Sequence, residues 1–241
     1  MITLLLATRN RYKADEIRAI LGENFRYRTL NDFPAAPEVV EDAGTFAGNA
    51  TKKSVALAKW LGSLDAPQYA AFLPHGAPSL TKPLLVLADD SGLEVDALNG
   101  APGVHSARFA ALDTGQPGNS PTADNNAKLL RLLNDVPQAQ RTARFRCVIA
   151  LTPVGKLEAK NASPVCNADE FELETELFEG ACEGRIGFEL RGQGGFGYDP
   201  LFTPKGYERT FGELPELVKN RLSHRARALA ALKAALKRHK V

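Results

Sequence analysis

The sequence predicts an α/β fold, in which helices flank a mixed β-sheet. Two observations point to this class. Short apolar runs typical of buried strands alternate along the chain with longer segments whose apolar residues recur at helical spacing. The composition is that of a globular protein, because 44% of the 241 residues are hydrophobic, 24% are charged and the formal net charge is +2. A disordered chain would have fewer apolar residues and a larger net charge.

The strands are predicted from short apolar runs, and they are expected at 2–7, at 84–88, at 142–152 and within 171–191. The helices are predicted from apolar residues three or four positions apart, and they are expected from Thr8 to Leu21 after an initial turn, from Thr45 to Leu61, from Asp124 to Leu133 and from Ser223 onward. The proline-rich stretch 63–83 is expected to be a surface insertion, and a second insertion is expected near 155–170.

The small net charge hides a basic C-terminal segment. From Lys219 to Val241 there are 8 Lys/Arg and no Asp/Glu, which leaves 22 basic and 28 acidic residues in the rest of the chain. A basic end on an acidic body indicates an anionic partner, and nucleic acid, a membrane surface and a phosphorylated small molecule are the three candidates.

The sequence shows neither a membrane span nor a secretory signal. No apolar run approaches the roughly 18 residues that a membrane helix needs, and the cations near the N-terminus follow the short apolar run there instead of preceding it. Cys147, Cys166 and Cys182 are odd in number and form no Cys-x-x-Cys pair, so free thiols in a reducing compartment are expected. We therefore expect a cytoplasmic location.

Two predicted helix starts carry cations, although helix N-termini favour acidic residues. One is 8–13 (TRNRYK), and the other is 223–227 (SHRAR). A helix N-terminus is positive because its free N–H groups and its dipole point outward, so added cations favour an anion such as phosphate. The alternative is that Thr8, Asn10 and Ser223 are simple helix caps.

Acidic residues that suit a magnesium ion follow the strand predicted at 84–88. The Asp-Asp-Ser-Gly sequence at 89–92 is expected at the carboxyl end of this strand, where ligands of α/β proteins bind. Adjacent residues there point to opposite faces, so only one of Asp89 and Asp90 need face a site. Magnesium binds one or two carboxylates together with substrate phosphates and water, and Glu41 would supply a second carboxylate. The alternative for 89–92 is a plain turn.

The glycine-rich segment 192–197 matches the G-x-G-x-x-G pattern of dinucleotide-binding proteins. That pattern must open a helix, whereas Tyr198, Asp199 and Pro200 follow directly here. The segment is therefore interpreted as a loop whose backbone approaches a ligand, with Phe196 available to stack on a planar base; a core phenylalanine in a glycine turn is the alternative. A dinucleotide-dependent oxidoreductase is a minor alternative function.

Six sequence blocks occur in a fixed order and span nearly the whole chain. They are Thr8-x-Asn10-x-x-Lys13, Glu41 to Phe46 with Asn49-Ala50-x-x-Lys53, Ala88 to Leu93, Gly100 to Gly103 continuing to Phe109, Gly194 to Pro200, and Lys219-Asn220-x-x-Ser223-His224-Arg225. Together these blocks resemble the inosine/xanthosine triphosphate pyrophosphatases, which clear non-standard purine nucleotides. The chain departs from the family's pattern at the two insertions, at Val218 and in the spacing of Gly44 and Thr45.

The resemblance implies an elongated, two-lobed α/β domain over 1–241, with a long curved mixed sheet, a nucleotide cleft between the lobes and a homodimeric assembly. It implies that Asp90 is the general base and that Glu41 and Asp90 bind Mg²⁺. The triphosphate would be bound by Thr8, Asn10, Lys13 and Lys53, with Ser91 as a further substrate contact. The base pocket would comprise Phe196, Gly197, Tyr198, Asp199, Lys219, His224 and Arg225.

The implied reaction is the magnesium-dependent hydrolysis of ITP, dITP or XTP to the nucleoside monophosphate and pyrophosphate. Arg225 and Lys219 only donate hydrogen bonds, so they would pair with a 6-keto oxygen but not with the 6-amino group of adenine. A site built for one such pattern rejects the wrong base. A related nucleotide pyrophosphatase with another base preference is the nearest alternative, and a nucleic-acid-binding module a remote one. Neither a nucleic-acid nor a membrane partner is expected.

Overall fold

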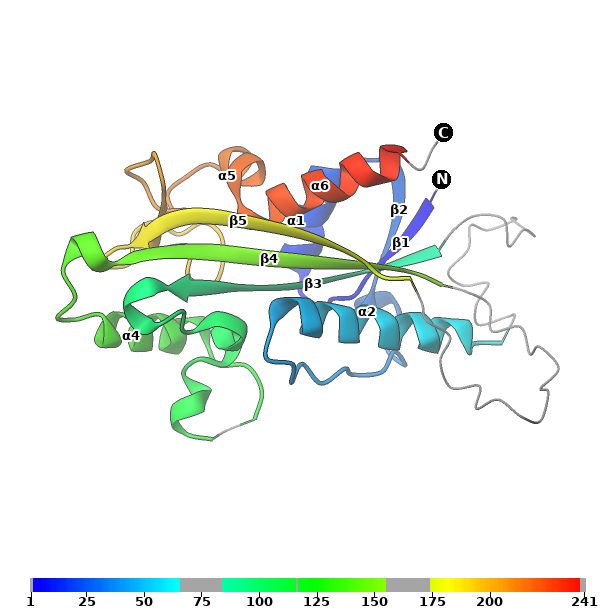
Figure 1. The fold of residues 1–241 in the computed structure, drawn as a ribbon, viewed down its shortest axis with the longest axis horizontal. Helices are drawn as coiled ribbons and strands as arrows, with labels where there is room; N and C mark the ends of the chain where they lie inside the picture. Colours follow the sequence, from blue (N-terminus) through cyan, green and yellow to red (C-terminus); the bar gives the residue numbers. More distant parts are fainter. Residues whose placement is uncertain (1, 66–83, 116, 155–173, 239–241) are drawn as a thin grey trace. The chain divides into compact units, whose positions relative to one another are not determined.

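The computed structural model describes residues 2–65, 84–115, 117–154 and 174–238. Its six strands form a mixed sheet in the order β2-β1-β3-β4-β5-β6 (Figure 1). The strands are β1 (Ile2–Leu6), β2 (Phe25–Thr29), β3 (Leu84–Val95), β4 (Thr142–Pro153), β5 (Glu176–Ile186) and β6 (Phe202–Pro204). The α-helices of the described residues are α1 (Arg11–Leu21), α2 (Phe46–Gly62), α4 (Thr122–Leu132), α5 (Glu216–Leu222) and α6 (His224–Arg238). β1 is parallel to β2 and β3, whereas β5 and β6 are antiparallel, which confirms the predicted α/β class with a mixed sheet.

The chain divides into two compact units, and we describe each separately. The first unit comprises Met1–Ala43, Ala47–Asp89 and Ile149–Leu177. The second comprises Gly44–Phe46, Asp90–Val148 and Phe178–Val241. The single domain over 1–241 and the nucleotide cleft between two lobes stay predictions.

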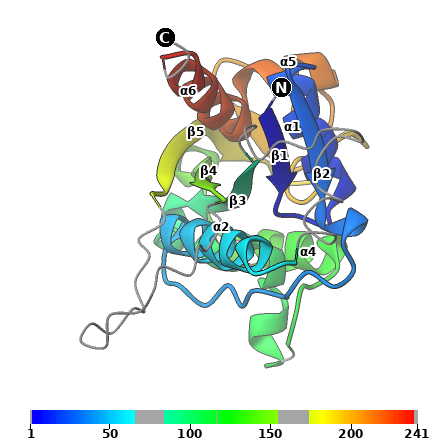
Figure 2. The same cartoon turned by 90° about the vertical axis from the view of Figure 1, so that its right-hand side faces the viewer.

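In the first unit, β1 is covered on both faces. Leu5 packs with α2 and the first half of β3 in one cluster of buried residues. Leu4 and Leu6 are also fully buried, and alternation along the strand turns them to the other face. Figure 2 accordingly shows α1 and α2 on different sides of β1. Leu6 pairs with Leu87 of β3, so the turn that leads into α1 begins beside the middle of β3.

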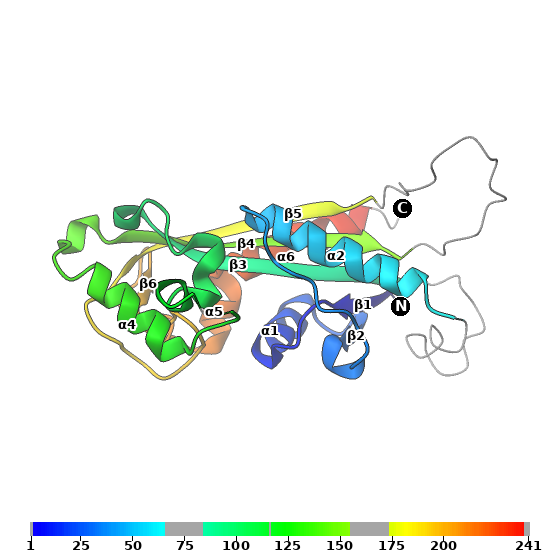
Figure 3. The same ribbon diagram turned by 90° about the horizontal axis from the view of Figure 1, so that it is seen from below.

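In the second unit, one apolar cluster joins the second half of β3 to α4, β4, β5 and the segment that follows β5. Phe145 of β4 lies at its centre, with its ring centroid 4.7 Å from Phe202 and 6.2 Å from Phe211. α4 lies beside the segment that follows β3 (Figure 3), where Asn125 accepts a hydrogen bond from Ala110 N and donates one to Ala107 O. This core supports the glycine-rich loop at 192–200.

The predicted elements are found within a few residues of their expected bounds, except that β3 is longer than its predicted strand. The sequence missed β2, β6 and α5, which are short. The two expected insertions, 63–83 and 155–170, lie outside the described residues apart from 63–65. Among the helices of the described residues, none is long and apolar enough to cross a membrane.

Candidate functional site

The start of α1 is capped by Asn10, one of the two residues that the sequence offered for this role, and the other, Thr8, supports the cap. Asn10 Oδ1 accepts a hydrogen bond from Lys13 N at 3.3 Å, and Thr8 Oγ1 accepts one from Asn10 N at 3.0 Å. The first turn contains no acidic residue. The remaining N–H groups and the helix dipole therefore keep a positive potential that no side chain of this turn neutralises.

The cations of this helix start have different surroundings. Arg9 donates to Leu30 O at 2.9 Å and to Ala36 O at 3.4 Å, so its guanidinium holds the following loop in place. Lys13 points instead to β3, where its Nζ lies 2.5 Å from Asp89 Oδ1. The sequence argument counted three cations of this segment, Arg9, Arg11 and Lys13, toward an anion site, and Lys13 is the one that meets the predicted acidic segment.

A second lysine meets the same segment from α2. Lys53 Nζ lies 2.7 Å from Glu41 Oε1 and donates to the backbone carbonyl of Asp89 at 3.3 Å. The side chains of Lys53 and Asp89 are 12% and 3% exposed, whereas their ion-pair partners Glu41 and Lys13 are 36% and 22% exposed, so solvent screens both pairs in part. Lys13, Glu41, Lys53 and Asp89, all in the first unit, thus form one cluster of alternating charge.

The placement of 89–92 at the end of a strand was wrong. β3 continues to Val95, because Leu93 and Val95 are buried in the core of the second unit. Leu93 N also donates to Ser106 Oγ at 2.9 Å, and a Cβ on Gly92 would lie 2.6 Å from the same oxygen. Polar residues inside the strand therefore do not form a turn. Asp89 and Asp90 are both buried, and strand alternation points them to opposite faces.

The second unit holds the predicted base-binding residues around the glycine-rich loop. Asp199 Oδ2 accepts hydrogen bonds from Phe196 N at 2.7 Å and from Lys219 Nζ at 2.6 Å. Lys219 Nζ lies 4.6 Å from the centroid of the Phe196 ring, and the guanidinium carbon of Arg225 lies 5.7 Å from it. The structure therefore brings together Phe196, Asp199, Lys219 and Arg225.

The loop at 192–200 opens no helix, which confirms that it does not form the dinucleotide fingerprint. Two contacts hold its second half. Asn126 Nδ2 of α4 donates to Gly197 O at 3.2 Å, and the Tyr198 hydroxyl donates to Ser106 O at 2.8 Å. Burial raises the pKa of Tyr198, so this hydroxyl stays protonated and remains a donor. Tyr198 thus anchors the loop to the backbone of Ser106.

The start of α6 carries the remaining predicted residues. Ser223 Oγ accepts a hydrogen bond from Ala226 N at 3.1 Å, which makes Ser223 the expected helix cap. The ring of His224 stacks on Phe145 with centroids 4.9 Å apart and planes at 14°. Arg225 is 1% exposed and donates to Ser91 Oγ at 3.4 Å. Arg225 thus links the predicted substrate contact on β3 to the loop that carries Phe196.

Sequence reasoning missed two supporting residues. Asp89 had no assigned role, and no local pattern indicates that it pairs with Lys13, which lies 76 positions away. Asn126 was passed over as part of an amphipathic helix. A signal for Asn126 was present in the sequence, because two polar residues, Asn125 and Asn126, follow each other inside α4. Both are buried in the structure.

The donor chemistry of the first unit is compatible with a magnesium ion. Among the described residues there is no group of three or more His, Cys, Asp or Glu side chains that would enclose a metal. Magnesium does not require one, because it usually binds one or two carboxylates and takes its other ligands from phosphates and water. Within the first unit, Glu41 and Asp89 supply hard oxygen atoms of this kind.

Comparisons with known proteins identify the family of this chain. A dITP/XTP pyrophosphatase of Desulforamulus reducens is 46% identical over 228 residues, 94% of this chain and 91% of the relative. One of Shouchella clausii is 41% identical over 233 residues, 97% of this chain and 96% of the relative. The structure of a HAM1 protein from Coxiella burnetii covers 99% of this chain and 100% of its own, with a TM-score of 0.72 and 32% identity. Since the family model also matches residues 4–235, the chain belongs to the Ham1 family.

Proposed function

We propose that this protein hydrolyses ITP, dITP and XTP to the nucleoside monophosphate and pyrophosphate, and so removes non-standard purines from the nucleotide pool. The observation that carries the proposal is the charge cluster of the first unit, in which Lys13 and Lys53 both meet the Asp89 segment and Glu41. The two lysines supply positive charge for the phosphates, and Glu41 supplies a carboxylate for a magnesium ion. The dITP/XTP pyrophosphatase names of full-length relatives support the same substrate class.

The triphosphate is assigned to the start of α1 and the two lysines. Thr8 and Asn10 shape the helix start, whose N–H groups and dipole favour an anion. Lys13 and Lys53 stabilise the charge that develops on the leaving pyrophosphate. Glu41 and Asp90 would hold the Mg²⁺ ion, which when bound offsets charge on the phosphates.

Asp90 is assigned as the general base. It accepts a proton from the attacking water while the water oxygen forms a bond to phosphorus. The bridging bond between the α- and β-phosphoryl groups breaks, and its electron pair leaves with pyrophosphate. Asp90 is 7% exposed, so its carboxylate is held in place by the protein around it.

The purine is assigned to the residues around Phe196. The Phe196 ring would stack on the base, and Lys219 and Arg225 would donate to a 6-keto oxygen. Adenine presents a 6-amino donor at that position, which would leave buried donors unpaired, and discrimination of about 10⁴ is the scale for such a mismatch. Gly197, Tyr198 and Asp199 shape the loop, His224 lies beside Arg225, and Ser91 is a further contact.

A cytoplasmic homodimer with neither a nucleic-acid nor a membrane partner completes the proposal. Free, buried thiols at Cys147 and Cys182 support a reducing compartment. Sedimentation equilibrium tests the assembly, and a single species at the mass of one chain would contradict the dimer.

A pyrophosphate-release panel tests the activity. With Mg²⁺ present, release from ITP, dITP and XTP should exceed release from GTP, ATP and dTTP. Asp90→Asn should lower turnover of ITP by at least about 10²–10⁴-fold, the range expected for loss of a general base. ITP binding, measured by calorimetry, should be largely retained. Asp135→Asn, at an exposed site, is the matched control. Full activity of Asp90→Asn would contradict the mechanism.

A further inference from the structure

We infer that Gly180 of β5 is a positioning residue for purine recognition, because its missing side chain lets the first turn of α6 rest directly on the strand. The inference rests on the proposed function, in which Arg225 and His224 at the start of α6 bind the base. Gly180 touches no substrate in this arrangement and acts only through the helix.

Figure 1 shows α6 beside β5, and at Gly180 the backbone of α6 lies directly against the strand. A Cβ on Gly180 would lie 2.5 Å from Ala228 N, 3.0 Å from Arg227 Cβ and closer still to His224 O. Ordinary contacts between such atoms are about 3.5–4.0 Å. Gly180 is not among the described glycines with a positive φ, so its backbone conformation is open to alanine. Glycine is therefore required at position 180 because a Cβ has no space there, and not because of the backbone conformation.

Two further contacts fix the same turn of α6. Arg227 donates to Ala181 O at 2.8 Å, one residue along β5 from the glycine. The stacking of His224 on Phe145 ties the helix to β4. Since the helix start is set by these contacts, the position of Arg225 follows from the surface of β4 and β5.

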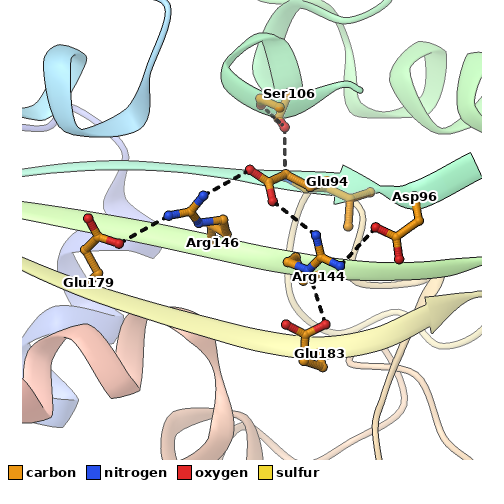
Figure 4. Close-up of polar contacts among 9 residues, drawn as sticks. Glu94, Asp96, Ser106, Arg144, Arg146, Glu179 and Glu183 are labelled. Atoms are coloured by element: carbon orange, nitrogen blue, oxygen red, sulfur yellow. Dashed lines mark hydrogen bonds and ion pairs between the residues drawn. The ribbon is translucent and has the colours of Figure 1, made fainter. Parts of the chain in front are cut away.

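β5 is held to its neighbours through its opposite face (Figure 4). Glu179 and Glu183, on either side of the glycine, accept hydrogen bonds from Arg146 and Arg144 of β4, each at 3.2 Å. Both arginines also form ion pairs with Glu94 of β3. Backbone pairing and this network hold β5 in the sheet. When volume is added at the glycine, the helix start is therefore the part that moves.

A methyl group at position 180 would push the first turn of α6 outward by about 1 Å, the shift needed to restore normal contact distances. Arg225 already lies 3.4 Å from Ser91 Oγ, so a shift of that size breaks this hydrogen bond. A misplacement of about 1 Å can cost about 10²-fold in rate. Because Arg225 is assigned to the 6-keto oxygen, the loss should be larger for ITP than for ATP.

The test measures kcat/KM for ITP and for ATP in wild type, Gly180→Ala and Gly184→Ala. Gly184 is the matched control, because a Cβ there would also be crowded, lying 2.5 Å from Phe202 Cζ, but its neighbours belong to β6 and not to α6. Unfolding midpoints are recorded for all three proteins. Gly180→Ala should lower the ITP/ATP ratio at least about tenfold, within the scale of a small misplacement. Gly184→Ala should lower stability but keep the ratio.

Each outcome decides between the two proposals. If wild type itself does not prefer ITP, the proposed function fails. If wild type prefers ITP but folded Gly180→Ala keeps the ratio, or Gly184→Ala lowers it equally, the positioning role is overturned. Should Gly180→Ala not fold, Arg227→Met removes the neighbouring anchor from an exposed position. An unchanged ratio in Arg227→Met would then overturn the inference, and a lowered ratio would support it.

Discussion

Replacing Asp199 by asparagine is expected to destabilise the protein by about 3–5 kcal/mol, the usual cost of leaving one ion of a buried pair without its counterion. Lys219 Nζ lies 2.6 Å from Asp199 Oδ2, and the two side chains are only 8% and 3% exposed. At that separation and an effective dielectric constant of about 20, the attraction is about 6 kcal/mol. Asparagine keeps the volume and an oxygen for the Phe196 N–H, so the substitution isolates the charge.

A double-mutant cycle separates the pair from other effects. Asp199→Asn and Lys219→Met each leave one buried ion, so the double variant should be more stable than the sum of the two losses predicts. Urea unfolding followed by circular dichroism supplies the four free energies. Glu183→Gln, which removes an exposed partner of Arg144, should cost less than about 1 kcal/mol. The reasoning would be refuted if the losses of unfolding free energy in the two single variants simply added up in the double variant. It would also be refuted if Asp199→Asn cost as little as Glu183→Gln.

Two further predictions concern buried groups of the second unit. Arg141→Lys should cost about 2–4 kcal/mol in urea unfolding, because one ammonium cannot replace a guanidinium that donates to the carbonyls of Leu133, Val136 and Gly187; a change within error would contradict this role. In a Cys166→Ser variant, no thiol should react quickly with Ellman's reagent at neutral pH until urea is added. Cys147 and Cys182 are buried, and burial raises the pKa of Cys182 to about 11; a fast-reacting thiol in the native protein would contradict this.

The sequence predicted the elements whose apolar pattern is strong. β1, α1, α2 and β4 have runs or stripes that only one kind of element can bury. β2 was missed because Arg26 and Arg28 alternate with aromatic residues in an edge strand, which is only half-buried and does not need an apolar run. The strand end expected at 89–92 was wrong for the opposite reason. Polar residues occupy the middle of a strand there, so the apolar run ends before the strand does.

For the site, sequence reasoning found the charged residues but not their partners. The Asn10 cap of α1 follows from a local motif and is present in the structure, whereas the binding role of the residues around Phe196 stays a prediction. The pairing of Lys13 with Asp89 depends on the register between β1 and β3, which no local pattern encodes. The close approach of α6 to Gly180 likewise appears only when the helix and strand are packed together.

If Lys13 and Lys53 bind phosphates as proposed, their pairing with carboxylates has a consequence for which anions the protein admits. Lys13 and Lys53 are already neutralised by Asp89 and Glu41, so a bare phosphate ion must compete with those carboxylates for the ammonium groups. Under the proposed function, a phosphate chain that arrives with a divalent cation gives Glu41 a new counterion as its phosphates take the lysines. Under the proposed function, this neutral resting state discriminates against the abundant free phosphate of the cell and favours metal-bound nucleotides.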